Sequence, residues 1–284
     1  MTRLTTGLRA PRNLSADAKG SIHDDETATT LGFRAGTVAG DIHLEQFGGL
    51  CVEAFGHEWF ERGWISMHFL QATADLEPVE AWLEGTGQIR DAGMSTPDGT
   101  GVCRGNVGIG DASGSTLTVR DKRPADPSTM RMLRGVEPGT SLDRQRRGPN
   151  KDEQLARMRT GASTDPLSLY GDRSPWGGGI CSPLTTCQLL AAGVTDSIAA
   201  AARDFVGMYG AIEIRHLDGP VFLDRTYDIE GEVICVSDSP KTEILWFTTR
   251  ATVIGHNSPV AEMTMMTRLL KESSPLYSGQ PRHE

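Results

Sequence analysis

The sequence predicts an α+β protein in which one unit, a long helix packed on a curved antiparallel sheet, occurs twice. The first observation is an internal repeat, which reads GWISMHFLQATADLEPVEAWLEG from Gly63 and GAIEIRHLDGPVFLDRTYDIEG from Gly210. The second is an apolar helical segment before each copy, and the third is a series of strand-like segments after it. The offset of about 147 residues is close to half of the 284-residue chain, which indicates a duplicated unit rather than a solenoid.

The helix of the first unit is predicted within GDIHLEQFGGLCVEAFG, just upstream of the repeat. Phe47, Leu50, Cys51 and Ala54 form an apolar stripe at helical spacing there. Asp41 is placed to cap the start of this helix, because a short acidic side chain can accept a hydrogen bond from the free N–H groups of the first turn. The stripe predicts that the helix is buried against a sheet.

The second helix is predicted within 182–205, where Ser182 is a favourable N-cap and Pro183 suits the first turn because its missing N–H costs nothing there. Segments rich in β-branched and aromatic residues follow each helix. They span 64–71, 78–90, 101–110 and 115–120 in the first unit, and 211–217, 221–236, 242–254 and 260–270 in the second. Each helix can bury its stripe on such a sheet, so the units are placed at 1–125 and 166–284.

The segment between the units, 126–165, is rich in Arg, Pro, Gly and Asp and is predicted to be a solvated linker. An alternative is that some of its basic residues meet the phosphate of a ligand. The candidates are Arg131, Arg134, Arg144, Arg146, Arg147 and Lys151.

Composition and charge exclude several classes of protein. The formal charge of −9 disfavours general nucleic-acid binding, which needs a basic surface. Five cysteines without CxxC spacing, and an N-terminus without the apolar core of a signal peptide, favour a cytoplasmic protein with reduced thiols. No apolar run approaches the roughly 20 residues that cross a bilayer. We expect a soluble monomer or homodimer that binds neither membranes nor nucleic acids.

The segment 21–47, SIHDDETATTLGFRAGTVAGDIHLEQF, carries the residues best suited to catalysis. His23 can transfer a proton near neutral pH, and a carboxylate such as Asp24 or Asp25 can fix its tautomer. Backbone N–H groups at the start of the predicted helix, near Gly40, can stabilise a developing oxyanion. These parts predict a site that enolises a thioester or adds water across its conjugated double bond.

His43 and Asp41 are predicted in the first turn of the same helix. A helix start lowers the pKa of a histidine and favours its neutral form, so His43 is a candidate base or donor; the plainer alternative is that it packs under the linker while Asp41 caps the helix. Together with His23 and Asp25 these residues could ligate zinc or iron, but their spacing matches no compact metal motif. We expect neither a metal nor a cofactor.

The run I-H-x-D-x-x-A-x-x-x-G-F-x-x-G-x-x-x-G, over about 25 residues, resembles the hydratase segment of MaoC-like proteins, which include (R)-specific enoyl-CoA hydratases. His23 matches the histidine of that family, Asp25 the following acid and Gly40 the glycine at the helix start. The two-unit organisation resembles the double hotdog members of the family. The resemblance implies a double hotdog fold and a hydro-lyase that acts on an enoyl or 3-hydroxyacyl thioester, with coenzyme A as the expected thiol, by His/Asp acid–base catalysis.

The sequence departs from the family pattern at the second catalytic group, because Ala18 stands where the family has an aspartate five residues before the histidine. The candidates for a replacement are the local Asp24 and Asp25, Asp17 after a one-residue shift, and Asp172 in the second unit. Around Asp172 the run YGDRSPWGG resembles the same family segment, with Trp176 in place of the histidine. One hypothesis is that the first unit keeps the catalytic residues and the second opens a groove for a bulky acyl group.

Three other functions stay open at this point. A hotdog thioesterase would centre on an acid in the middle of the helix, such as Glu45 or Glu53. A tailoring enzyme would dehydrate or cyclise a metabolite that is not a thioester. A non-catalytic acyl-binding protein would keep the fold without the chemistry.

Overall fold

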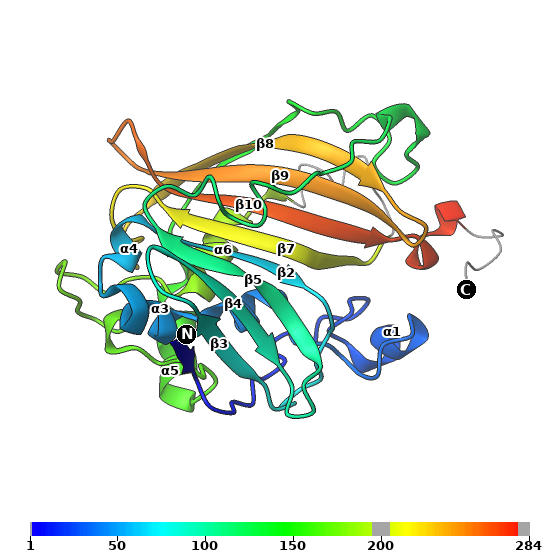
Figure 1. Ribbon diagram of the computed structural model, residues 1–284. Coiled ribbons are helices and arrows are strands. Elements are labelled where there is room, and N and C mark those ends of the chain that lie inside the picture. The colour runs from blue at the N-terminus through cyan, green and yellow to red at the C-terminus, as the bar shows by residue number, and fades with distance from the viewer. Residues whose placement is uncertain (1, 195–204, 278–284) are drawn as a thin grey trace.

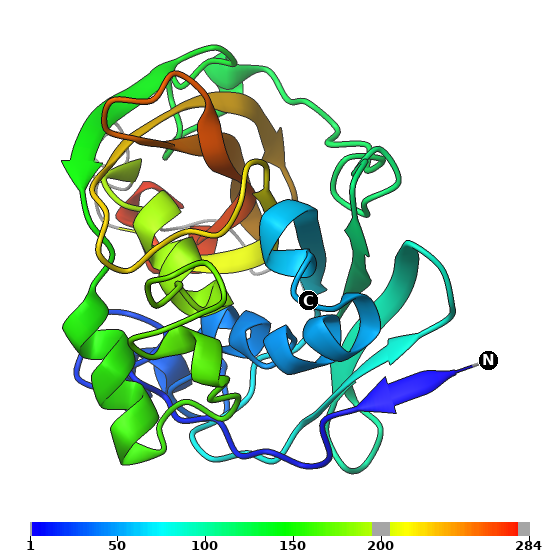
Figure 2. The same cartoon turned by 90° about the vertical axis from the view of Figure 1, so that its left-hand side faces the viewer.

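The computed structural model describes residues 2–194 and 205–277, which form one ten-stranded antiparallel sheet that bends around the helices (Figures 1 and 2). The strand order is β1-β3-β4-β5-β2-β7-β10-β9-β8-β6. The strands are β1 (Arg3–Thr5), β2 (Gly63–Phe69), β3 (Glu80–Glu84), β4 (Ile89–Ser95), β5 (Gly101–Ile109), β6 (Ser141–Arg147), β7 (Gly207–His216), β8 (Tyr227–Asp238), β9 (Thr242–Val253) and β10 (Pro259–Leu270). The helices are α1 (Asp25–Thr30), α2 (Gly40–Glu45), α3 (Gly48–Phe55), α4 (Trp59–Arg62), α5 (Lys151–Thr160) and α6 (Pro183–Leu190).

The two halves of the sheet join at the antiparallel pair of β2 and β7. In this pair Ser66 lies opposite Glu213, and these residues are separated in sequence by the same 147 positions as Gly63 and Gly210. β2 and β7 are therefore the equivalent strands of the two units, and they pair with each other about a local pseudo-twofold axis. The sequence repeat is the signature of this symmetry.

The predicted helix of the first unit is divided into α2 and α3. At the break the Asp165 carboxylate accepts a hydrogen bond from the N–H of Gly49 at 2.6 Å and pairs with Arg9 at 3.0 Å. Gly48 lies against the Tyr170 hydroxyl, with no room for a Cβ. Side chains from a distant segment fix the break. The Asp165 carboxylate accepts from the Gly49 N–H, which in a continuous helix would donate to a backbone carbonyl of the preceding turn.

Two expectations about the first unit and the linker differ from the structure. Residues 115–120 are not a strand, because Leu117 donates its N–H to the Ser66 hydroxyl and Ser115 bonds to Glu213, so this segment packs across the sheet instead of extending it. The predicted linker contains strand β6, which pairs with β8, and helix α5. Two of its basic side chains have a structural role, because Arg144 and Arg146 both pair with Asp228.

The second helix begins as predicted, with the Ser182 hydroxyl accepting from the N–H of Thr185 and Pro183 in the first turn. The part of this helix predicted over 195–204 lies outside the described residues. Helix α6 packs against α2 and against β7, β9 and β10, so buried side chains of both halves form one core. All five cysteines are buried free thiols, and no helix in the described ranges is long and apolar enough to span a membrane.

Candidate functional site

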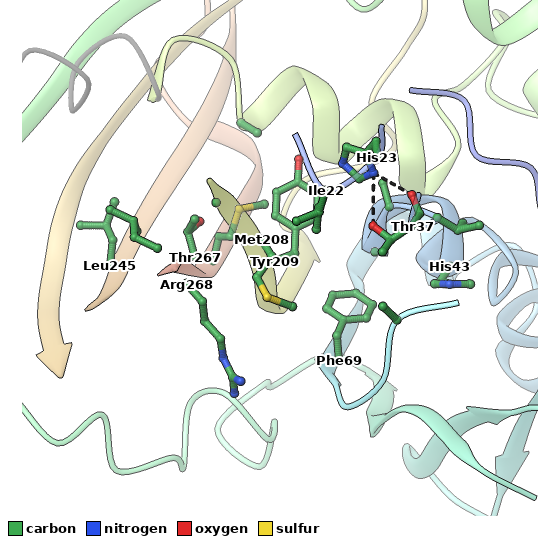
Figure 3. Close-up of a pocket in the computed structure, with 18 of the residues that line it drawn as sticks. Ile22, His23, Thr37, His43, Phe69, Met208, Tyr209, Leu245, Thr267 and Arg268 are labelled. Atoms are coloured by element: carbon green, nitrogen blue, oxygen red, sulfur yellow. Dashed lines mark hydrogen bonds between the residues drawn. The ribbon is translucent and has the colours of Figure 1, made fainter. Parts of the chain in front are cut away.

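A cavity of about 810 Å³ lies between the two halves of the molecule (Figure 3). The first half contributes the loop that carries His23, the start of α2 and the end of β2. The second half contributes the start of β7 and parts of β9 and β10. The lining is mostly apolar and includes Ile22, Val38, Phe69, Leu70, Ala191, Val194, Phe205, Met208, Leu245, Phe247, Met265 and Leu269. Such a lining, with a few polar groups, is typical of a site for a small organic ligand.

His23 lies on the wall of this cavity with a defined tautomer. Its Nδ1 is 2.7 Å from the backbone oxygen of Thr37 (Figure 3). A carbonyl oxygen can only accept a hydrogen bond, so Nδ1 carries the proton in the neutral ring and Nε2 keeps its lone pair. The loop itself is held by Asn13, whose amide donates to the His23 oxygen at 2.7 Å, and by the N–H of Thr37, which donates to Ile22.

Neither local carboxylate is hydrogen-bonded to the His23 ring. Asp24 accepts from Lys19 at 2.9 Å and from the Thr27 hydroxyl at 2.6 Å, and these bonds hold the pKa of its carboxyl well below the usual range. Asp25 accepts from the N–H of Gly36 at 2.7 Å. Both acids therefore fix the loop around α1. The expectation that one of them orients the histidine differs from this geometry, in which a backbone carbonyl does so.

The more distant acids and Trp176 lie outside the cavity. Asp17 is exposed, and Asp172 is exposed near Lys151 at 3.7 Å. Trp176 donates its indole N–H to Glu61 at 2.7 Å and packs beside Phe60, away from the cavity lining. The second half contributes its share of the cavity through strands β7, β9 and β10, not through the segment around Trp176.

Gly40 begins α2 and lines the cavity against the ring of Phe69. A Cβ at this position would lie 2.7 Å from a carbon of that ring, so only glycine allows the ring to pack this closely against the start of α2. Asp41 is buried behind it and accepts from the N–H of Ile42 at 2.9 Å. Burial raises the pKa of Asp41 to about 7. Asp41 lies inside the first turn, and the N-cap position is taken by Ala39.

His43 also lines the cavity and is almost completely buried. Its Nε2 is 2.9 Å from the Thr73 hydroxyl, and its Nδ1 has no hydrogen-bond partner among the described residues. Burial lowers the pKa of His43 to about 4, so the ring is neutral at neutral pH. This agrees with the expected neutral state, but the cause is burial more than the helix start.

Sequence reasoning did not find the polar residues that the second half contributes, Tyr209, Thr267 and Arg268. Tyr209 reaches the cavity where the pairing of β7 with β10 shifts register between Met266 and Thr267. Such a bulge re-aims side chains. The signal in the sequence was Gly210, which interrupts the alternation at the start of the repeat. The charge of Asp41, together with burial, raises the pKa of the Tyr209 phenol well above its usual value.

Within residues 2–194 and 205–277, no three His, Cys, Asp or Glu side chains gather in a way that could hold a metal ion. His23, Asp25, Asp41 and His43 are each engaged separately, with Thr37, Gly36, Ile42 and Thr73 respectively.

Known proteins resemble this chain in structure and not detectably in sequence. No protein-family model matches it, and no curated protein matches its sequence. A protein from Chloroflexus aurantiacus described as a MaoC domain dehydratase has a TM-score of 0.61 at 14% identity, over 95% of this chain and 94% of the other. A conserved hypothetical protein of Mycobacterium tuberculosis with a double hotdog fold has a TM-score of 0.64 at 12% identity, over 94% and 95%.

A third solved structure, described as a MaoC-like dehydratase, has a TM-score of 0.55 at 12% identity and covers 94% of this chain and 97% of that one. The similarity extends over nearly the whole length of all three proteins. The chain therefore has the double hotdog fold, and its structural neighbours include MaoC-like dehydratases.

Proposed function

We propose that the protein is a hydro-lyase that adds water to an enoyl thioester or removes it from a 3-hydroxyacyl thioester. The observation that carries the proposal is the His23 ring, held by Thr37 in the tautomer that leaves Nε2 unprotonated on the wall of an apolar cavity. An imidazole with this arrangement is a general base at neutral pH and becomes a general acid once protonated.

In hydration, Nε2 of His23 takes a proton from water while the water oxygen bonds to C3 of the enoyl group. The electron pair of the double bond moves to C2 and the thioester oxygen, which becomes an enolate oxygen. The N–H of Gly40, in the first turn of α2, has no intrahelical acceptor and can donate to that oxygen. The proton on His23 then moves to C2, and dehydration is the reverse.

In place of the aspartate carboxylate of the family pattern, the backbone carbonyl of Thr37 contacts the His23 ring. The Thr37 oxygen orients the ring as a carboxylate would, but it stabilises the imidazolium less because it bears no full charge. We therefore propose that His23 is the single proton-transferring residue, with Asp24 and Asp25 supporting its loop.

The test is hydration of 2-enoyl-CoA substrates of several chain lengths, including ring-bearing acyl groups. His23→Ala should lower the rate by about 100- to 10,000-fold, the usual contribution of a positioned acid–base group. The control is His57→Ala, since His57 is exposed beside Trp176 and outside the cavity. The proposal fails if wild type hydrates none of these substrates, or if the His23 variant is as active as the control.

The structure gives a thioesterase no comparable support. Glu45 is buried and accepts from the Ser163 hydroxyl at 3.0 Å, and Glu53 is exposed on α3. Neither carboxylate lines the cavity. We expect no release of free thiol from the same substrates, which a thiol-detection assay measures directly.

A further inference from the structure

Three basic side chains lie together beside the cavity, on the face of the sheet opposite the helices. Arg268 comes from β10 and lines the cavity, His68 comes from β2, and Arg120 follows β5. Nη1 of Arg120 is 3.5 Å from Nδ1 of His68. Strand β7 lies between β2 and β10 in the sheet. Three residues that are far apart in the sequence therefore form one basic patch across β7.

The face on which these side chains lie follows from strand alternation. Met67 belongs to the main core, so its neighbour His68 points to the other side of the sheet. On that side Ala211, which pairs with His68, and Met266 belong to a separate small cluster. Arg268 follows Met266 by two positions and shares its face. Figure 3 shows the Arg268 side chain extending away from His23, beyond Met208 and Tyr209.

Within the described part of the chain, neither Arg268 nor Arg120 forms an ion pair with a carboxylate, although the chain carries 37 acidic and 28 basic residues. Nε of Arg268 is buried without a hydrogen-bond partner. Burial and the charge of Arg120 lower the pKa of Arg268, and burial with both guanidinium groups lowers the pKa of His68 to about 4. Like charges held together at a partly desolvated site destabilise the unliganded protein, and a bound anion would offset this cost.

We propose that Arg268 and Arg120 bind the anionic group of an amphipathic ligand whose apolar part occupies the cavity. A guanidinium group matches phosphate and carboxylate oxygens with two parallel hydrogen bonds, and the apolar lining accepts a hydrocarbon chain. The inference deepens the proposed function and rests on it for the reaction, because a nucleotide thioester joins an acyl chain to phosphate groups. A free carboxylic acid carries the same charge and is the second source of such an anion.

Binding can be measured by calorimetry with four ligands of one saturated chain length. Acyl-CoA carries phosphates, and the corresponding acyl-pantetheine does not; the free fatty acid carries a carboxylate, and its methyl ester does not. Wild type should bind one anionic ligand at least about tenfold more tightly than its neutral analogue, and added salt should reduce the difference. A preference within the first pair identifies phosphate as the source, and a preference within the second identifies carboxylate.

The double variant Arg268→Gln/Arg120→Gln should lose this preference while keeping its affinity for the neutral ligand. Arg144→Gln is the matched control, because Arg144 is exposed at the far edge of the sheet and paired with Asp228. The melting temperature of the unliganded double variant should equal or exceed that of wild type, since repulsion is removed. Equal affinity of wild type for charged and neutral ligands, or a preference that survives in the double variant, overturns the proposal.

These outcomes are separate from the hydration assay. Saturated ligands are not turned over, so charge-dependent binding can be present when no enoyl-CoA is hydrated. Conversely, a protein that hydrates enoyl thioesters without any charge preference keeps the proposed function and loses the anion site.

Discussion

The cavity has a counterpart across the pseudo-twofold axis, and the two places are used differently. The repeat offset relates the end of β2, at 69–72, to the end of β7, at 216–219, and it relates the start of β7, at 207–209, to residues 60–62 of α4, just before β2. The end of β2 and the start of β7 line the cavity of about 810 Å³ around His23. The end of β7 and the end of α4 border a smaller pocket of about 380 Å³ beside Trp176.

Aromatic side chains occupy much of the counterpart, beside this smaller pocket. The ring of Phe60 lies 5.7 Å from His216, 6.0 Å from Tyr170 and 6.3 Å from Trp176, and Trp59 lies 5.5 Å from His216. Edge-to-face arrangements at these distances are stabilising. Duplication within one chain therefore lets one place keep a large apolar cavity for a ligand, while aromatic packing leaves only the smaller pocket at its equivalent.

The largest expected effect is on stability, at the aromatic side chains of the counterpart. Phe60→Ala should lower the free energy of unfolding by about 3–5 kcal/mol, because it removes the ring that contacts the other aromatics of the counterpart. Urea unfolding at pH 7 measures this change. Ligand affinity at the open cavity should stay within twofold of wild type, and a tenfold loss would show that the two places are coupled.

A second effect concerns pH. Burial lowers the pKa of His216 to about 4, below its ordinary 6.5, so protonation favours the unfolded chain. Its contribution to stability is complete above pH 6.5 and is lost as the pH falls toward 4. His216→Phe, which introduces the residue found at the equivalent position 69, should reduce the stability lost between pH 7 and pH 5 by about 2 kcal/mol.

Denaturant unfolding of both proteins at the two pH values measures that difference. The two proteins are compared because Asp41 has the opposite pH dependence. Its pKa is raised to about 7, so its contribution to the free energy of unfolding falls as the pH rises toward 7. This contribution is the same in both proteins and cancels in the difference. Parallel pH profiles for wild type and variant would contradict the assignment to His216.

The smallest effect tests the open cavity by filling it. Thr267→Phe places a ring in the cavity from β10, where an aromatic residue suits the strand. Affinity for a saturated acyl ligand should fall by about tenfold or more, equivalent to about 1.4 kcal/mol. Trp176→Ala is the control, and it should leave affinity unchanged because Trp176 borders only the counterpart. A loss of affinity in Trp176→Ala alone would show that the ligand binds at the smaller pocket beside Trp176 and not in the large cavity.

Much of the fold could be predicted from the sequence because each copy of the repeat is a continuous segment whose pattern can be recognised directly. The pairing of Ser66 with Glu213 has the offset that the two Gly-initiated segments already show. The division of the helix between α2 and α3 could not be predicted, since it depends on Asp165, which is more than a hundred positions away. The segment 115–120 has strand-like composition, but Ser66 and Glu213 satisfy its polar groups from the sheet face.

The candidate site was predicted in part. His23, Gly40 and His43 do line one cavity, as their place in the sequence indicated. The partner of the His23 ring is a backbone oxygen, and every residue has one, so no side-chain pattern could reveal it. The basic patch depends on the register between β10 and β7, which brings Arg268 close to residues two strands away.

The pairing of β2 with β7 has a consequence for any separated half of the chain. Without the other half, β2 would become a sheet edge whose N–H and C=O groups lack partners, and such edges recruit further strands. Because Ser66 lies at the centre of the pair, a second copy of the same half could dock there through an identical register. That assembly would carry two equal hollows, and fusion into one polypeptide is what permits them to become unequal.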